Sequence, residues 1–292
     1  MKKLFKLAVA LCATIISFSA FAQDEELQIK KETVIINPFT KTAAVTQAQC
    51  DNIRAAVLSG ISARGRFYVV DALTDSTLAK LYENRSYEDA VNDANWKEES
   101  ETAYKSLGAQ SLIIGTANNV SVSSKTDDKG KVTYTCEVTI SLKVYNIMDG
   151  SMTASEDIKV TGSSRDSKDA AFNKAMSSIN SRMSSFVDAH FKFESYILDL
   201  GEADKKGRMK ELFILGGAEM GITKGLVFTV HAEKKIGPKV TKQQIGKIVA
   251  KEVMDGVTKC NITDGEDAIK TTFNDDPKKL TVILSHQRLT LF

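Results

Sequence analysis

The 292-residue chain is 42% hydrophobic and 26% charged, with a formal net charge of +2. Once the predicted signal peptide, 1–22, is set aside, 36 Lys and Arg residues stand against 37 Asp and Glu residues, a net charge of −1. This balance, with no basic stripe, gives a nucleic-acid or polyanion partner little electrostatic support. The rest of the chain exceeds the usual size of one domain, so we expect two.

The N-terminal segment, 1–22, has the pattern of a secretory signal peptide. Three lysines precede the apolar run Leu7–Phe18, and Ala20–Ala22 offers a small-x-small cleavage site. A membrane anchor is less well supported, because the run is shorter than the ~20 residues that cross a bilayer. A lipoprotein signal at Cys12 is a further alternative, but Leu11 is too large for the residue before a lipidated cysteine. We expect a periplasmic location and leave peripheral outer-membrane association open.

Three cysteines remain after the signal peptide, and their spacings match no zinc or redox motif. Each lies at an apolar position of its predicted element, which favours a small buried hydrophobic side chain. The alternative is a disulfide between Cys50 and Cys136 with Cys260 left free, since connectivity cannot be deduced from sequence.

The next part of the chain alternates strand and helix patterns. A short acidic leader, residues 23–31, precedes an apolar strand over Thr33–Phe39. Helical spacing over Thr46–Gly65 predicts a helix whose N-cap is the threonine and whose stop is the glycine. A second strand is predicted over Arg66–Ala72.

A charged, locally acidic helix is predicted between Glu83 and Lys105. Tyr87 belongs to its thin apolar stripe, and Trp96, the only tryptophan, lies just beside that stripe. An aromatic side chain in a lightly packed charged helix is a common interface anchor, so we single out Tyr87, Trp96 and Tyr104 as candidate protein-interaction residues. The alternative is that Trp96 covers the domain's own core, as one aromatic at helical spacing usually does.

The most regular pattern runs from Ser111 to Ser163 and predicts three antiparallel strands. Apolar residues occupy every second position from Val132 to Val144, the period of a half-buried strand. Turn residues at 127–130 and 148–151 supply the connections. We expect the same parity on both sides of this strand, at Leu112, Ile114, Val120, Val122, Met152, Ala154, Ile158 and Val160.

A long amphipathic helix over Asp166–Phe193 is expected to cover this meander with one apolar face. The order of strands and helices predicts an α/β (α+β) sandwich domain, in which a mixed sheet carries helices on one face.

Short strands and glycine-rich or charged turns follow, which predicts a small all-β barrel of the SH3 or OB kind. The glycine-dense segment Gly216–Gly225 runs into a strand and does not open a helix, so we interpret it as a tight turn and not as a phosphate loop. Asp264–Asp267 is interpreted as a solvated turn, with a weak calcium site as the alternative, because the EF-hand pattern is absent. The predicted strands are Tyr196–Leu200, Leu212–Leu215, Leu226–His231, Ile245–Val253, Val257–Ile262 and Leu280–His286.

His190, His231 and His286 are the only histidines, and no nucleophile motif accompanies them. His190 has no second histidine or cysteine at ligand spacing, so a packed or capping role is favoured. We predict no catalytic residue, no metal site and no cofactor, with a triad assembled from scattered residues as the residual alternative.

Three segments, Thr33–Phe39, Gly65–Asp71 and Leu107–Thr116, resemble the signature strands of the CsgG-like periplasmic domain family. That family includes the curli secretion component, the LpoB activators of penicillin-binding proteins and the N-terminal domain of TolB. The resemblance covers residues 32–192 approximately, and it implies envelope work by protein contact without catalysis.

The C-terminal module is similar to the small barrel that follows such a domain in the flagellar assembly protein FlgT, on the segments 221–230 and 245–249. Two features depart from the curli channels, which are lipid-anchored and line a pore with amphipathic strands. The chain lacks a good lipobox, and a charged helix over Ser86–Lys105 stands where strands could have been inserted. Charges in Lys125–Lys131 also interrupt the only candidate pore strand.

We therefore expect an exported, non-enzymatic adaptor or assembly factor that contacts envelope proteins, with homo-oligomerisation left open and no nucleic-acid partner. The alternatives are a ring-forming outer-membrane secretion component, and a small-ligand or glycan binder, which would need a cleft with converging polar groups. The expected division of the chain is a signal peptide (1–22), a leader (23–31), the α/β domain (32–193) and the barrel domain (194–292).

Overall fold

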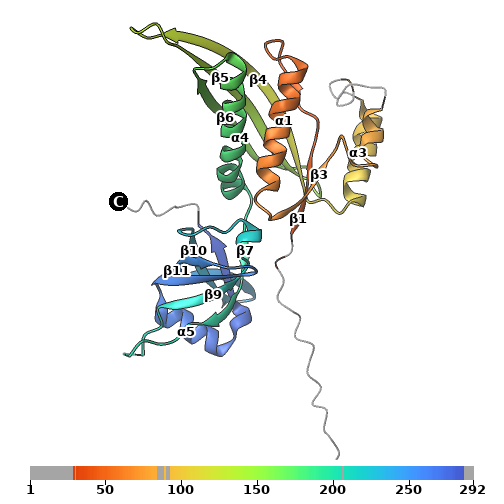
Figure 1. The fold of residues 1–292 in the computed structure, drawn as a ribbon. Coiled ribbons are helices and arrows are strands. Elements are labelled where there is room, and N and C mark those ends of the chain that lie inside the picture. The colour runs from red at the N-terminus through yellow and green to blue at the C-terminus, as the bar shows by residue number, and fades with distance from the viewer. Residues whose placement is uncertain (1–28, 30, 84–88, 90–92, 206, 286–292) are drawn as a thin grey trace, which may run out of the picture.

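The computed structural model describes residues 29, 31–83, 89, 93–205 and 207–285. The predicted signal peptide and all but two residues of the predicted leader lie outside these ranges. The described residues form two sheets, each with its own hydrophobic core, as Figure 1 shows. Among the helices of these residues, none is long and apolar enough to pass through a membrane.

The first sheet contains the predicted meander. Its strands are β1 (Glu32–Ile36), β2 (Thr40–Lys41), β3 (Phe67–Asp71), β4 (Ser111–Thr126), β5 (Val132–Asn146) and β6 (Met152–Ser164). The order is β3-β1-β4-β5-β6, with β2 beside β4. β1 is parallel to β3 and β4, whereas β4, β5 and β6 are antiparallel. The mixed sheet of the predicted fold class is therefore confirmed.

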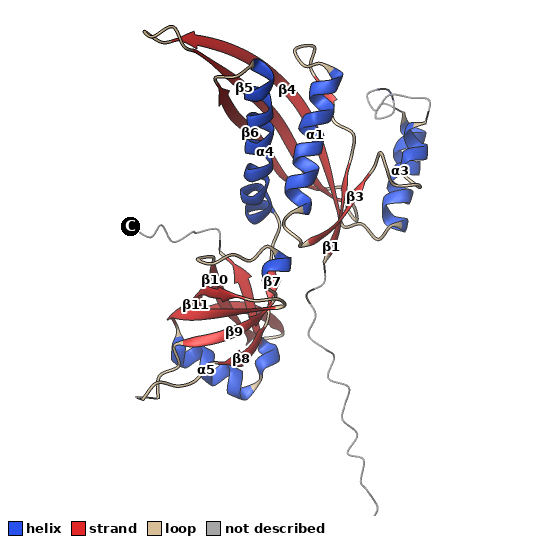
Figure 2. Ribbon diagram, in the orientation of Figure 1, coloured by secondary structure: helices blue, strands red, loops and turns tan. Residues whose placement is uncertain are grey.

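Helices α1 (Gln47–Ser62) and α4 (Lys168–His190) cover one face of this sheet, as Figure 2 shows. Thr46 caps α1 as predicted, with a capping box. Val138 of β5 is 0% exposed and faces this helical layer. α4 lies so close to β6 that a Cβ at Gly162 would be 2.2 Å from the Ala175 nitrogen. The helix-covered core is thus packed directly against the meander.

The predicted alternation along β4 is wrong in its first half. A register shift between Ala117 and Asn119 marks a β-bulge, and a bulge inserts one extra residue that changes which face the following residues meet. Val120 consequently packs against the helix-covered core, while Leu112 packs in a cluster on the opposite face. Val122 lies at the edge of the helix-covered side, where it lines a surface pocket with residues of α1 and α4 such as Gln49 and Phe172, and it is 39% exposed.

That opposite cluster is covered by a 3-10 turn, η1 (Ala79–Tyr82), and by α3 (Ala94–Ser106). Its buried members come from both sheet and helix: Ile35, Ala72, Leu78, Tyr104, Ala109 and Ile147. Helices therefore lie on both faces of the sheet, with α3 at one end only. The charged helix is shorter than predicted because Asp93 caps it; residues 84–88 and 90–92 lie outside the described part of the chain.

The second sheet is antiparallel and curves into a nearly closed barrel, with the order β7-β13-β10-β11-β12-β9-β8. Each of the six predicted strands is present, so the fold class is confirmed here too. The strands are β7 (Glu194–Ser195), β8 (Ile197–Leu200), β9 (Glu211–Leu215), β10 (Val227–Ile236), β11 (Lys239–Val253), β12 (Val257–Asp264) and β13 (Leu280–Leu284).

The barrel carries one helix that the sequence pattern did not reveal, α5 (Glu266–Asp275), followed by a 3-10 turn, η3 (Pro277–Lys279). Gly265, at φ 77°, starts α5, and the Glu266 carboxylate accepts a hydrogen bond from the Met209 N–H. The segment weighed as a calcium site therefore begins a helix. The Gly216–Gly225 segment is a turn around η2 (Ala218–Met220), with positive φ at three glycines.

All three cysteines that follow the predicted signal peptide are buried, and Cys50 and Cys136 form no disulfide. Burial raises the pKa of the Cys260 thiol to about 12 and also raises that of Cys136. The thiolate is the reactive species. We therefore expect the folded chain without residues 1–22 to react with no equivalent of a thiol reagent such as Ellman's within minutes, and with three equivalents after denaturation. Rapid reaction of the native protein would contradict this placement.

Candidate functional site

Two of the three predicted interaction residues lie within the described chain, and both are buried. Trp96 is 5% exposed, packs on Leu81 and Tyr82, and donates its indole N–H to the Leu81 carbonyl oxygen at 3.1 Å. Tyr104 is 3% exposed, and its hydroxyl contacts the Asn37 side chain. Tyr87 lies outside the described residues. Trp96 thus contributes to the domain's own packing, and an interaction role for these residues stays a prediction.

A groove of about 480 Å³ lies between α3 and the β5–β6 turn. Tyr104 forms part of its floor, and Met148 at its edge is 73% exposed. Leu112 and Ile114 of β4 line the same groove. The lining is mixed, because charged side chains of α3 also border it, namely Lys97, Glu101 and Lys105.

A cluster of buried charges lies where the part of the molecule built on the first sheet meets the part built on the second, the two domains that we predict. Arg64 and Arg66 flank the turn between α1 and β3, and both donate to the same Asp188 oxygen of α4, at 2.6 and 2.8 Å. The Arg66 Nε donates to the Met220 carbonyl oxygen of η2 at 2.9 Å. We call Arg64, Gly65, Arg66, Asp188 and η2 the interdomain joint.

The joint is also a contact between main chains. A Cβ at Gly65 would lie 1.9 Å from the Glu219 carbonyl oxygen, and a Cβ at Gly221 would lie 2.5 Å from the Arg64 carbonyl oxygen. Both glycines have positive φ, 66° in each case. At both positions glycine is therefore required for two reasons: it adopts positive φ without strain, and it has no Cβ that would clash with the facing carbonyl oxygen.

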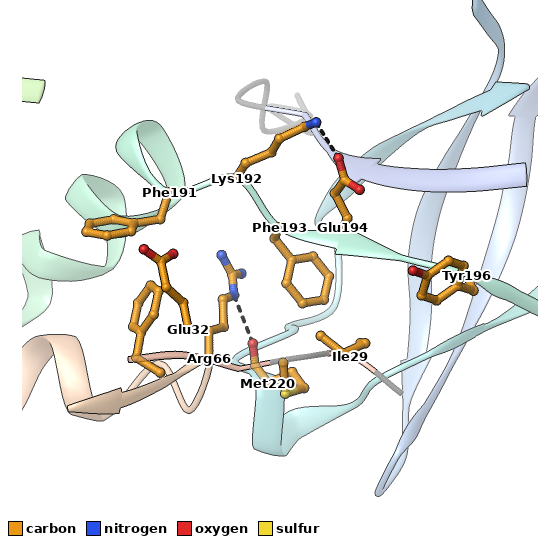
Figure 3. A pocket seen from close by; sticks show the side chains of 10 residues that line it. Ile29, Glu32, Arg66, Phe191, Lys192, Phe193, Glu194, Tyr196 and Met220 are labelled. Atoms are coloured by element: carbon orange, nitrogen blue, oxygen red, sulfur yellow. Dashed lines mark hydrogen bonds and ion pairs between the residues drawn. The ribbon is translucent and has the colours of Figure 1, made fainter. Parts of the chain in front are cut away.

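A crevice of about 250 Å³ opens beside the joint, as Figure 3 shows. Arg66 points into it, with its guanidinium 4.7 Å from the centre of the Phe193 ring. Burial lowers the pKa of Arg66 to about 10, against the opposing effect of Asp188, so the guanidinium stays charged at neutral pH. The residues around it are Ile29, Glu32, Phe67, Phe191, Lys192, Phe193, Glu194, Tyr196 and Met220.

The carboxylates of this crevice have partners, whereas the buried Nη2 of Arg66 has none among the described residues. Glu194 pairs with Lys192 and Lys242, and Glu32 accepts a hydrogen bond from the Ser111 hydroxyl. The crevice is also smaller than a usual ligand pocket, which starts at roughly 300 Å³. These two properties favour a structural role in holding the domains over the small-ligand alternative.

The histidines form local contacts. His190 forms a hydrogen bond with Glu156 of β6 at 2.8 Å, and Glu156 also forms an ion pair with Arg182. His231 forms a hydrogen bond with the Thr229 hydroxyl at 2.9 Å. Burial lowers the pKa of His231, as do the nearby lysines. The contact of His190 agrees with the packed or capping role predicted for that residue; His286 lies outside the described residues.

A long exposed arm extends from the first sheet. β4 and β5 remain paired as far as Thr126 and Val132, and all residues from 121 to 131, which we call the β4–β5 arm, are exposed. On its other side β4 pairs with β1 and β2 no further than Ala117. Among the described residues, no strand pairs with the outer edge of β4 from Asn119 to Thr126.

Comparison with known proteins finds no matching family model and no matching curated protein. Among solved structures, the PelC dodecamer from Paraburkholderia phytofirmans has a TM-score of 0.33 at 13% identity, covering 51% of this chain and 85% of that one. Lipoprotein GNA1162 from Neisseria meningitidis has a TM-score of 0.36 at 10% identity, covering 52% and 98%.

The LpoB C-terminal domain from Escherichia coli has a TM-score of 0.29 at 13% identity and covers 44% of this chain and 82% of that domain. LpoB is a member of the family that the sequence is predicted to resemble, and the likenesses to CsgG and FlgT stay predictions. At these TM-scores the likenesses carry no inference about activity or partners.

Proposed function

We propose that this protein is an exported, non-enzymatic adaptor of the bacterial envelope, and that it holds a partner protein at the open edge of β4. The observation that supports this most directly is the unpaired edge from Asn119 to Thr126 on an arm whose residues 121–131 are all exposed.

An open strand edge presents a row of backbone N–H and C=O groups, and a strand of another chain can pair with them. Native proteins usually shorten or cover such edges. Here the strand is 16 residues long, and its distal part lies beyond the helical layer. β6 pairs with β5 no further than Tyr134, so beyond Ser124 the arm is a two-stranded ribbon. Such a ribbon is marginally stable alone, and a further strand on β4 would stabilise this end of the arm as well as bind it.

The side chains of the arm are mostly polar or charged, which favours contact with one specific partner over nonspecific adhesion to apolar surfaces. Ser121, Ser123 and Ser124 surround Val122 and precede a charged turn at 125–131. The charges discourage random edge-to-edge pairing, while the hydroxyl groups and the valine give a partner strand side chains to recognise. The interdomain joint would then set where the barrel stands relative to that partner.

The test places a photoreactive p-benzoylphenylalanine at Ser123 in cells that express the full chain. Irradiation is expected to link the arm to one protein, and the same probe at Ser177, on the exposed face of α4, is expected to give no such product. A product containing two copies of this chain would favour the ring-forming alternative, and equal products from both positions would contradict the proposal.

A proline pair adds a backbone control. Successive N–H groups of a strand point to opposite edges, so Ser121→Pro and Val122→Pro differ in which edge they damage. The variant that keeps its thermal midpoint has lost the N–H that points away from β5. Its crosslinking yield is expected to fall about tenfold, which corresponds to the loss of one good hydrogen bond. Undiminished crosslinking in that variant would exclude strand pairing.

A further inference from the structure

The hairpin of β10 and β11 carries a concentration of positive charge that the overall net charge conceals. All residues from 233 to 244 are exposed, and we call this segment the basic hairpin. It contains four lysines and one acidic residue, Glu233. Lys242 is paired with Glu194 at 3.2 Å. Within the described chain, no salt bridge is formed by Lys234, Lys235 or Lys239.

Two aliphatic side chains stand among these lysines. Ile236 is 60% exposed and Val240 is 62% exposed. They flank the turn at Gly237, which has φ 60°. The tip of the hairpin is thus both apolar and basic, and neither side chain packs on the barrel core.

The pairing register shows how these residues are arranged. Ile236 is opposite Lys239, and Lys235 is opposite Val240. Paired residues of an antiparallel ribbon share a face, and neighbours along a strand alternate. Each face of the tip therefore carries one aliphatic residue beside at least one lysine. Neither face is apolar throughout, as a face covered by a flat protein surface would be.

We propose that the basic hairpin docks the protein end-on to an anionic lipid bilayer, which extends the proposed adaptor role by fixing the molecule to a surface. Lysine ammonium groups attract lipid phosphates near the bilayer surface. Ile236 and Val240 enter the interfacial layer, while the lysine stems let their charges stay at the headgroups. The charge complementarity selects a lipid surface as the occupant of this tip.

Flotation of the mature protein with vesicles tests the proposal directly. Binding to vesicles of phosphatidylcholine mixed with phosphatidylglycerol is expected at low ionic strength, where surface charges are weakly screened, with little binding to pure phosphatidylcholine. The triple variant Lys234→Gln, Lys235→Gln, Lys239→Gln is expected to bind about 100-fold more weakly, since each lysine contributes about a factor of five. Lys125→Gln, Lys129→Gln, Lys131→Gln on the β4–β5 arm is the matched control and is expected to change binding little.

Insertion is measured with Ile236→Trp, as the difference from the unaltered protein, whose own fluorescence comes from Trp96. The added fluorescence is expected to shift to the blue on anionic vesicles, whereas that of Val122→Trp should show no shift. Equal loss in both triple variants, equal binding to neutral vesicles, or no binding at all would overturn the proposal. Inositol hexakisphosphate can be added at the same phosphate concentration as the lipid. If it displaces the protein from the vesicles, the tip binds soluble phosphates instead, and the proposal is overturned. These assays contain no protein partner, so their failure leaves the contact at β4 untouched.

Discussion

Val138→Asp is expected to abolish folding of the α/β domain. The side chain is fully buried between β5 and the helical layer, so the substitution removes burial worth about 1.5–3 kcal/mol. It also places a carboxylate in a site that offers no charged partner in the surrounding core cluster, at a further cost of several kcal/mol. The sum approaches the ~5–15 kcal/mol stability of a whole domain. Circular dichroism and thermal melting of the purified chain measure the result.

Thr139→Asp is the matched control, one residue along the same strand. Thr139 is half-buried on the opposite face and is opposite Lys159 of β6, whose ammonium also pairs with Glu137 at 2.8 Å, so a new carboxylate lies near one shared positive charge. We expect its free energy of unfolding to change by less than about 1 kcal/mol. A soluble Val138→Asp protein with an unchanged thermal midpoint would mean that the faces of β5 have been exchanged.

Asp188→Ala is expected to open the interdomain joint. The Asp188 carboxylate is the shared partner of Arg64 and Arg66, whose side chains are 9% and 4% exposed. Breaking a buried pair by removing one partner costs about 3–5 kcal/mol, and here two guanidinium groups lose their carboxylate together. The Arg64 Nε and Arg66 Nη2 already lack a hydrogen-bond partner in the described structure, so little compensation is at hand.

Two measurements separate an open joint from general unfolding. Calorimetry is expected to resolve two transitions in the variant and one in the unaltered protein, and limited proteolysis of the variant is expected to cut near Phe191–Phe193. Glu156→Ala is the control, because Glu156 also bonds α4 residues but does so near the surface, where ion pairs contribute about 0–1 kcal/mol. Intact domain coupling in Asp188→Ala would show that the main-chain contacts alone hold the joint.

Local sequence signals located most elements of the fold. Thr46 is identified as an N-cap by its position before an apolar stripe, and it caps α1. The alternation from Cys136 to Val144 identifies the buried face of β5, because a strand that covers a core must repeat every second residue. The six barrel strands are likewise located by the glycine-rich or charged turns that separate them.

Features that depend on distant parts of the chain were not predicted. The bulge before Asn119 reverses the parity of β4 without any change in composition, and α5 is short enough to pass for a turn. Arg64 and Arg66 resemble surface residues in the sequence because their partner, Asp188, lies far along the chain. Arginines on both sides of a glycine were the one local hint of the joint. The basic hairpin also appears only when β10 and β11 are paired.

The contacts at Gly65 and Gly221 fix how the two halves of the molecule can move. Where carbonyl oxygens meet glycine Cα atoms, there is no layer of side chains that could repack to let one half slide across the other. Relative motion must instead begin with a separation of the two halves at the joint, and this separation exposes Arg64 and Arg66 to solvent. The spacing between the halves is therefore set by peptide geometry, and sequence drift within either core leaves it unchanged.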